Sequence, residues 1–199
     1  MTTPEPAALL RDTLGWAVRR LETVDVASPR IDAELLLAHV LRISRRELAR
    51  ELLFGDRSLD SEEHVDFRRC VEQRADRVPL QHLTGVAPFR HIELAVGPGV
   101  FVPRPETELL AGWGIERLGS LREHGRQSER LCAVDLCAGS GAIALSLAHE
   151  LPDVRAIAVE REGSALGWLA RNVEALEPSR SSAVEIVDGD ATSTRILSK

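Results

Sequence analysis

Apolar residues in the first 79 positions recur at intervals of three or four, which is the spacing of one helix face. The first of these stripes consists of Leu10, Leu14, Ala17, Val18 and Leu21. Ser28 and Pro29 then fit the N-cap and first position of a second helix. The apolar side expected for that helix is Ile31, Leu35, Leu36 and Val40.

Capping signals mark two more helices. Ser44 and Glu47 have the spacing of a capping box, and Gly55 is placed to end the same helix. A fourth helix is expected over 60–77, with an apolar side formed by Val65, Phe67 and Val71. Residues 1–79 are therefore predicted to form a small all-α bundle. Such a bundle can recognise a substrate or simply pack on the next domain, and Arg45, Arg46 and Arg50 are read as a solvated face.

Glycine and proline interrupt short apolar stretches between residues 81 and 102, and Phe89–Val96 suits a β-hairpin. The run Val102-Pro-Arg-Pro-Glu-Thr-Glu108 leads into a helix through about Leu121, and a polar loop is expected over 122–130. Residues 80–109 thus read as a hairpin and a linker.

Strands and helices alternate through the rest of the chain. Strands are expected over 131–135, 154–159 and 183–187, with helices over 142–150 and 164–176. This alternation predicts an α/β domain over 110–199, with a Rossmann-like parallel sheet and right-handed crossovers. The strands are nearly all apolar, as buried parallel strands are. Because only three are present, we expect the sheet to be incomplete on its C-terminal side, with the edge of the third strand exposed.

Composition excludes several classes of protein. The net charge of −6 argues against binding to a nucleic-acid backbone. No apolar run is long enough for a membrane helix, and the N-terminus lacks a signal peptide, so a cytoplasmic protein is expected. Cys70, Cys132 and Cys137 do not have the spacing of metal ligands, and no metal site is predicted.

The candidate chemistry lies between the first predicted strand and its helix, in Asp135-Leu-Cys-Ala-Gly-Ser-Gly141. Gly139 and Gly141 permit a sharp turn and leave room for a ligand against the main chain. Glu160 ends the next strand, where a carboxylate can accept both ribose hydroxyls of an adenosine group. Asp190 follows the third strand, where it can meet the adenine amino group.

Two cofactors compete for this pattern, and a strand–turn–helix glycine loop without a ligand is a third interpretation. The loop satisfies the dinucleotide fingerprint, which suits NAD. Asp135 precedes it, however, and its carboxylate would repel a pyrophosphate but attract the ammonium of a methionine group. The charge therefore favours S-adenosylmethionine.

With these residues in view, the chain resembles the bacterial methyltransferases that modify the N5 amide of a glutamine in peptide chain release factors. The resemblance is carried by the helical N-terminal domain and by three motifs: Pro79-Leu-Gln-His-Leu-Thr-Gly85, Phe101-Val-Pro-Arg-Pro-Glu-Thr-Glu108, and the run from Asp135 to Ala144. It implies a class I methyltransferase fold preceded by a helical domain that helps to engage class I release factors. It also implies methylation of the glutamine in their Gly-Gly-Gln motif.

The resemblance assigns cofactor contacts to Cys137, Ala138, Gly139, Ser140, Gly141, Glu160, Asp190 and Ala191. It places Arg104, Pro105 and Glu106 near the cofactor entrance, although the same residues also read as a helix start.

Two departures from the family pattern stand out. The family has glycine at the position of Cys137, so this cysteine needs a negative φ or accepts strain. The catalytic Asn-Pro-Pro-Tyr motif is absent from the 199 residues, so no catalytic residue can be named. The sequence therefore reads as a C-terminally truncated enzyme that is inactive alone and poorly soluble. Open alternatives are a ribosomal-protein glutamine methyltransferase, a non-catalytic cofactor-binding remnant and an NAD-dependent oxidoreductase.

Overall fold

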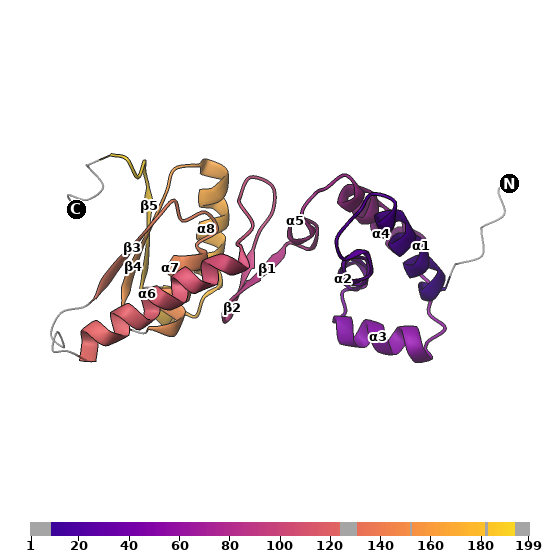
Figure 1. The fold of residues 1–199 in the computed structure, drawn as a ribbon, viewed down its shortest axis with the longest axis horizontal. Helices are drawn as coiled ribbons and strands as arrows, with labels where there is room; N and C mark the ends of the chain where they lie inside the picture. The colour runs from indigo at the N-terminus through magenta and orange to yellow at the C-terminus, as the bar shows by residue number, and fades with distance from the viewer. Residues whose placement is uncertain (1–8, 124–130, 152, 182, 194–199) are drawn as a thin grey trace. The chain divides into compact units, whose positions relative to one another are not determined.

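The computed structural model describes residues 9–123, 131–151, 153–181 and 183–193. The chain divides into two compact units, Met1–Thr84 and Gly85–Lys199 (Figure 1). The first unit is helical, and its helices are α1 (Leu10–Glu22), α2 (Pro29–Leu41), α3 (Arg45–Phe54), α4 (Ser61–Ala75) and α5 (Leu80–Thr84). The short helix α5 packs on α2 and α4, and so extends this unit past residue 79.

Capping boxes fix the starts of two of these helices. Ser44 and Glu47 form the predicted box at the start of α3, and Gly55 stands at its C-cap. Asp60 and Glu63 form a second box at α4, which the sequence reading did not identify. In each box a side chain accepts a hydrogen bond from a backbone N–H that the helix leaves without a partner. Local sequence thus sets where α3 and α4 begin.

The buried faces of α2 and α4 differ from the predicted ones. On α2 only Leu36 of the four predicted residues is fully buried, and Ile31 is exposed. On α4 Phe67 and Val71 are buried as predicted, whereas Val65 is 63% exposed. The residues of α2 that are buried lie on more than one side of the helix and include one acid. They are Asp32, Ala33, Leu36, Leu37, Ala38 and Leu41. Burial on α2 is therefore set by the helices packed on several of its sides and not by a single apolar stripe.

The second unit begins with an antiparallel hairpin of β1 (Val86–Phe89) and β2 (Ile92–Ala95). Helix α6 (Pro105–Glu123) follows and packs against α7 (Ala142–Glu150). It starts at the second proline of Pro-Arg-Pro, as the helix-start reading expected. It also runs into the segment predicted as a polar loop, of which residues 124–130 lie outside the described residues.

A parallel sheet forms the centre of this unit, with strand order β3-β4-β5. Its strands are β3 (Cys132–Leu136), β4 (Arg155–Glu160) and β5 (Val184–Asp188). Helix α8 (Gly163–Ala175) and the short helix α9 (Pro178–Ser181) lie between β4 and β5 in the chain. The predicted fold class is confirmed: a small helical bundle precedes an α/β unit with a parallel sheet.

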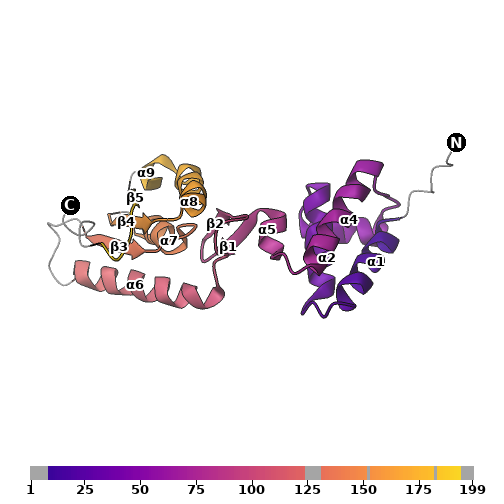
Figure 2. The same cartoon turned by 90° about the horizontal axis from the view of Figure 1, so that it is seen from above.

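Helices α7 and α8 lie on the same side of the sheet (Figures 1 and 2). Two right-handed crossovers that step in one direction along a sheet place both helices on one face. Ala156 and Ala158 of β4 face the helices and are fully buried, whereas Val134 and Leu136 of β3 are 45% and 50% exposed. The expectation that all three strands are buried was therefore wrong. Among the described strands β5 pairs only with β4, so its outer edge is unpaired as predicted. The exposed apolar residues on β3 were not predicted.

Among the described residues, none of the helices combines the length and the apolar character needed to cross a membrane.

Candidate functional site

The glycine loop joins the end of β3 to the start of α7, and three of its residues have positive φ. Cys137 has φ of 63°, Gly139 of 58° and Gly141 of 90°. The N–H of Ala138 donates to Val159 O at 3.0 Å, and the N–H of Gly141 donates to Ala138 O at 2.8 Å. These bonds hold the loop as a tight turn at the carboxyl end of the sheet. Cys137 accepts the left-handed conformation, so the strain anticipated for a non-glycine residue is present.

The two glycines of the loop serve different purposes. A Cβ on Gly141 would lie 2.0 Å from Leu145 Cδ1 and 2.6 Å from Leu169 Cδ1, and both leucines are fully buried. A Cβ on Gly139 would meet nothing within 4 Å. Gly141 is therefore needed for packing inside the protein. Gly139 faces open space, where a ligand can approach the main chain.

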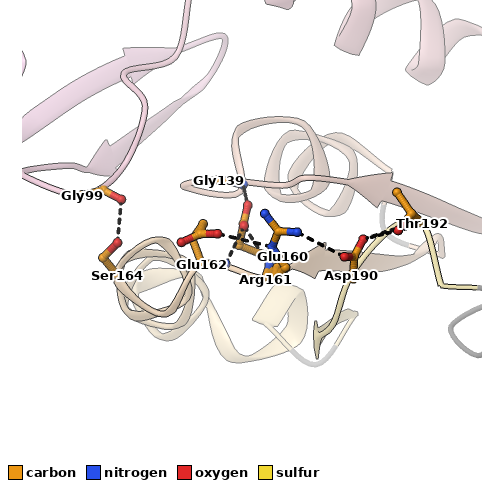
Figure 3. A network of polar contacts seen from close by, with 8 residues as sticks. All are labelled: Gly99, Gly139, Glu160, Arg161, Glu162, Ser164, Asp190 and Thr192. Carbon is orange, nitrogen blue, oxygen red and sulfur yellow. Dashed lines mark hydrogen bonds and ion pairs between the residues drawn. The ribbon is translucent and has the colours of Figure 1, made fainter.

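Glu160 is buried at the end of β4 and holds the loop in place. Its Oε2 accepts a hydrogen bond from Gly139 N at 2.8 Å, and its Oε1 accepts from the backbone N–H groups of Arg161 and Glu162 at 2.8 and 2.9 Å (Figure 3). Burial alone would raise the pKa of Glu160, but these three bonds together bring it below its ordinary value. A carboxylate has about four lone-pair sites, and three are used here, so the ionised group keeps capacity for about one further hydroxyl donor.

Asp135, the second acid of the site, lies on β3 just before the loop. Its Oδ2 accepts a hydrogen bond from Ala144 N, in the first turn of α7, at 3.1 Å. Burial raises the pKa of Asp135 to about 6, and the nearby charge of Glu160 adds to the rise, while the bond from Ala144 opposes it. Two carboxyl groups therefore flank the glycine loop, and a cation placed between them would lower the pKa of Asp135.

Asp190 follows β5 and is tied into a small exposed network. Its Oδ1 accepts from the backbone N–H and hydroxyl of Thr192, and its Oδ2 accepts from Arg161 Nη1 at 3.1 Å. The Thr192 side chain is the main cause that lowers the pKa of Asp190. Ala191 lies in the turn between Asp190 and Thr192. Arg161, which sequence reasoning did not single out, links the ends of β4 and β5 (Figure 3).

Arg104, Pro105 and Glu106 stand at the start of α6. The Arg104 guanidinium lies over the Phe101 ring, 5.2 Å from its centroid, and Arg104 O accepts a hydrogen bond from Thr107 N. In the part of the chain that the structure describes, no hydrogen bond or ion pair joins these three residues to the glycine loop. Their place at the cofactor entrance stays a prediction.

One side of α8 carries three side chains that sequence reasoning missed. Ser164 Oγ donates to Gly99 O at 2.9 Å, Trp168 Nε1 donates to Pro98 O at 3.2 Å, and the Asn172 carboxamide bonds to Ala95 and Ser140. They are spaced by four residues, so they share one helix face. The signal that could have revealed them is this i, i+4, i+8 spacing of hydrogen-bonding side chains along one face of the helix.

The site is built from acids, backbone donors and open space. Among the described residues, no three His, Cys, Asp or Glu side chains gather as metal ligands would. A strand–glycine loop–helix with an acid at the end of each of the first two strands defines an α/β unit of the Rossmann-like class.

Comparison with known proteins shows what this chain is similar to. Residues 12–85 match the family described as the PrmC N-terminal domain. A release factor glutamine methyltransferase of Streptomyces coelicolor is 44% identical over 183 residues, which are 92% of this chain and 59% of that protein. The proteins of the same name from Bifidobacterium longum and Escherichia coli are each 39% identical, over 96% and 75% of this chain and 64% and 50% of their own.

The resemblance to release factor glutamine methyltransferases is thus confirmed over nearly the whole chain, and the match to the PrmC N-terminal domain falls on the helical unit. The chain spans about three fifths of the length of the first relatives it matches. Among solved structures, a precorrin-6y C5,15-methyltransferase of Geobacter metallireducens matches at a TM-score of 0.37 and 18% identity, over 52% of this chain and 47% of that one. The assignment of the fold rests on the strand pairing of β3, β4 and β5.

Proposed function

We propose that this chain provides the S-adenosylmethionine-binding part of a release factor glutamine methyltransferase. In this proposal the methyl group goes to the side-chain amide nitrogen of the glutamine in the Gly-Gly-Gln motif of class I release factors. The relatives' names support the substrate, and the glycine loop with its two acids supports the cofactor.

The observation that carries the proposal is the pairing of open space at Gly139 with carboxyl groups on both sides of it. Glu160 is ionised and already fixed by three backbone donors, so its remaining acceptor site is oriented toward a ribose hydroxyl without reorganisation. Asp135, on the other side of the loop, can pair with the ammonium of a methionine group once its carboxyl group is ionised, above a pH of about 6. Asp190 and the Ala191 turn would meet the adenine, after Asp190 exchanges part of its contact with Arg161.

When bound, S-adenosylmethionine supplies a methyl group on a positively charged sulfur. The residues of this chain hold the cofactor in place: Asp135 would neutralise its ammonium, and Glu160 would orient its ribose. Arg104, Pro105 and Glu106 are proposed to border the cofactor entrance from the start of α6.

The acceptor amide needs separate help, because its nitrogen lone pair is delocalised into the carbonyl and is a poor nucleophile. Positioning by hydrogen-bond acceptors would hold that nitrogen in line with the methyl group. The 199 residues contain no Asn-Pro-Pro-Tyr sequence, and we assign this task to none of them. We therefore expect this chain by itself to bind cofactor and to transfer methyl groups poorly.

The test compares this chain with a fusion that continues it with the C-terminal part of the Streptomyces coelicolor relative. Each is incubated with labelled S-adenosylmethionine and a purified class I release factor, and a Gly-Gly-Ala variant of the release factor serves as the control. The fusion is expected to label the intact release factor only. Labelling of the Gly-Gly-Ala variant, or of a ribosomal protein in preference to the release factor, would contradict the proposed acceptor.

A further inference from the structure

Asn172 is a buried polar residue of α8 that is 4% exposed and uses its whole carboxamide. Its Oδ1 accepts a hydrogen bond from Ala95 N at 2.7 Å, and its Nδ2 donates to Ala95 O and to Ser140 O, both at 3.0 Å. Both amide protons and the oxygen are therefore satisfied. The side chain joins three segments that are far apart in the sequence.

On the hairpin side, Asn172 bonds to the outer edge of β2. In an antiparallel pair, alternate residues point their N–H and C=O groups toward the partner strand. Val96 N donates to Gly85 O across the hairpin, so the main-chain groups of its neighbour Ala95 point away from β1. Asn172 pairs with both of them, much as a neighbouring strand would.

On the loop side, Asn172 fixes one peptide group of the glycine loop. The peptide between Ser140 and Gly141 has its carbonyl bonded to Asn172 and its N–H bonded to Ala138 O at 2.8 Å. Ser140 itself is 3% exposed. With Glu160 on Gly139 N, the loop is therefore held from two sides by side chains of β4 and α8.

Trp168 and Ser164, one and two turns before Asn172 on α8, contact the residues that follow Ala95. Trp168 lies so close to Gly97 that a Cβ there would stand 2.4 Å from its ring. Ser164 bonds to Gly99 beside Glu162 and Glu160 (Figure 3). Residues 95–99 are thus fastened along the α8 face that also supports the glycine loop, and they lead directly to Phe101 and Arg104.

We propose that Asn172 is a positioning residue for cofactor binding. It fixes the position of the glycine loop relative to residues 95–99, which lead to the proposed cofactor entrance. The proposal rests on the function proposed above. It assigns Asn172 no contact with the cofactor and makes it act through Ser140 and Ala95.

The test uses Asn172→Asp, which keeps the size of the side chain but replaces its two donors with an acceptor facing two carbonyl groups. Asn172→Ser, which keeps at most one of the bonds, serves if the first variant does not fold. Val154→Ala is the matched control, because Val154 is fully buried just before β4, at the end of the strand away from the loop, and makes none of the loop's hydrogen bonds. Titration with S-adenosylhomocysteine gives the affinity, thermal melting gives the stability, and hydrogen exchange of the Gly139 and Gly141 amides reports on the loop.

We expect wild type and Val154→Ala to bind S-adenosylhomocysteine within about twofold of each other, and the Asn172 variants to bind about tenfold more weakly, as for the loss of a buried hydrogen bond. Faster exchange at Gly139 and Gly141 is expected in the Asn172 variants alone. Equal affinity and equal exchange in folded Asn172 variants would overturn the positioning role. Absence of binding by the wild-type chain would instead overturn the proposed function.

Discussion

The helical unit and the α/β unit bury their apolar residues in different ways. In the helical unit, helices packed on several sides of α2 bury Leu36, Leu37 and Phe67 completely. In the α/β unit, α7 and α8 cover one face of the sheet, while Val134 and Leu136 on β3 and Trp113 on α6 are 45–64% exposed. The α/β unit also holds the strained loop and both raised and lowered carboxyl pKa values. The α/β unit thus leaves apolar residues of its sheet exposed, whereas the helices of the other unit close around α2.

The largest expected effect tests whether the units depend on each other. Phe67→Ala removes a fully buried ring from the helical core and is expected to destabilise that unit by about 4 kcal/mol. Binding of S-adenosylhomocysteine by the α/β unit should remain within about twofold, because every proposed cofactor contact lies beyond residue 84. Calorimetric melts with and without ligand separate the two transitions. If S-adenosylhomocysteine binding is lost when the helical unit unfolds, the two units are not independent, contrary to this prediction.

The next effect separates the two loop glycines. Gly141→Ala forces a Cβ against Leu145 and Leu169 at positive φ, and is expected to destabilise the α/β unit by about 3 kcal/mol. Gly139→Ala meets no protein atom and should cost about 1 kcal/mol from backbone conformation alone. Denaturant unfolding measures both. Affinity for S-adenosylhomocysteine should nonetheless fall in Gly139→Ala, since its methyl group enters the open space over the loop.

Asp135 offers a prediction in which stability and binding move in opposite directions. Its folded-state pKa of about 6 lies above the ordinary value of 3.8, so the folded chain holds the proton more tightly than the unfolded chain. Stability from this group is complete below about pH 4 and is lost as the pH rises through about 6. Asp135→Asn removes the ionisation and should stabilise the protein at pH 7.5 by about 1–2 kcal/mol.

The same variant should weaken binding of S-adenosylhomocysteine, because an amide cannot neutralise the ammonium. Wild-type affinity is expected to rise with pH up to about 6 and then level off, and the variant should lack this rise. Unfolding curves and titrations at pH 5 and pH 7.5 check both statements. If the variant is more stable but binds S-adenosylhomocysteine as tightly as wild type, Asp135 does not contact the ligand.

The helix starts and the glycine loop could be predicted from the sequence, because each depends on a few residues that are close together in the chain. Ser44 with Glu47, and Gly139 with Gly141, are signals whose meaning depends on a few neighbouring residues. The exposure of Val134 could not be predicted, because it depends on which face of the sheet the crossovers cover. Asn172 was missed because its partners Ala95 and Ser140 lie 77 and 32 residues away. Periodicity likewise misplaced Ile31 and Val65, since it cannot say which neighbours close around a helix.

The smallest expected effect compares two residues with similar backbone strain, one from each unit. Cys137 in the loop and Arg42 at the end of α2 have φ of 63° and 53°. Cys137→Gly and Arg42→Gly should each stabilise the chain by about 0.5–1 kcal/mol, because glycine adopts this conformation freely. Only Cys137→Gly is expected to change the affinity for S-adenosylhomocysteine, which melting and titration together would show. If both variants bind S-adenosylhomocysteine as tightly as wild type, Cys137 does not border the ligand.

The most direct test of the account is the binding of S-adenosylhomocysteine and of NAD to the wild-type chain and to Glu160→Gln, measured by calorimetric titration at pH 7.5. Glu160→Gln keeps the size of the side chain but places an amide group among three backbone donors. We expect the wild-type chain to bind S-adenosylhomocysteine and not NAD, and the variant to bind it at least about tenfold more weakly. Tighter binding of NAD, or equal binding of S-adenosylhomocysteine by the folded variant, would contradict the central claim that this loop and its acids form a methyl-donor site.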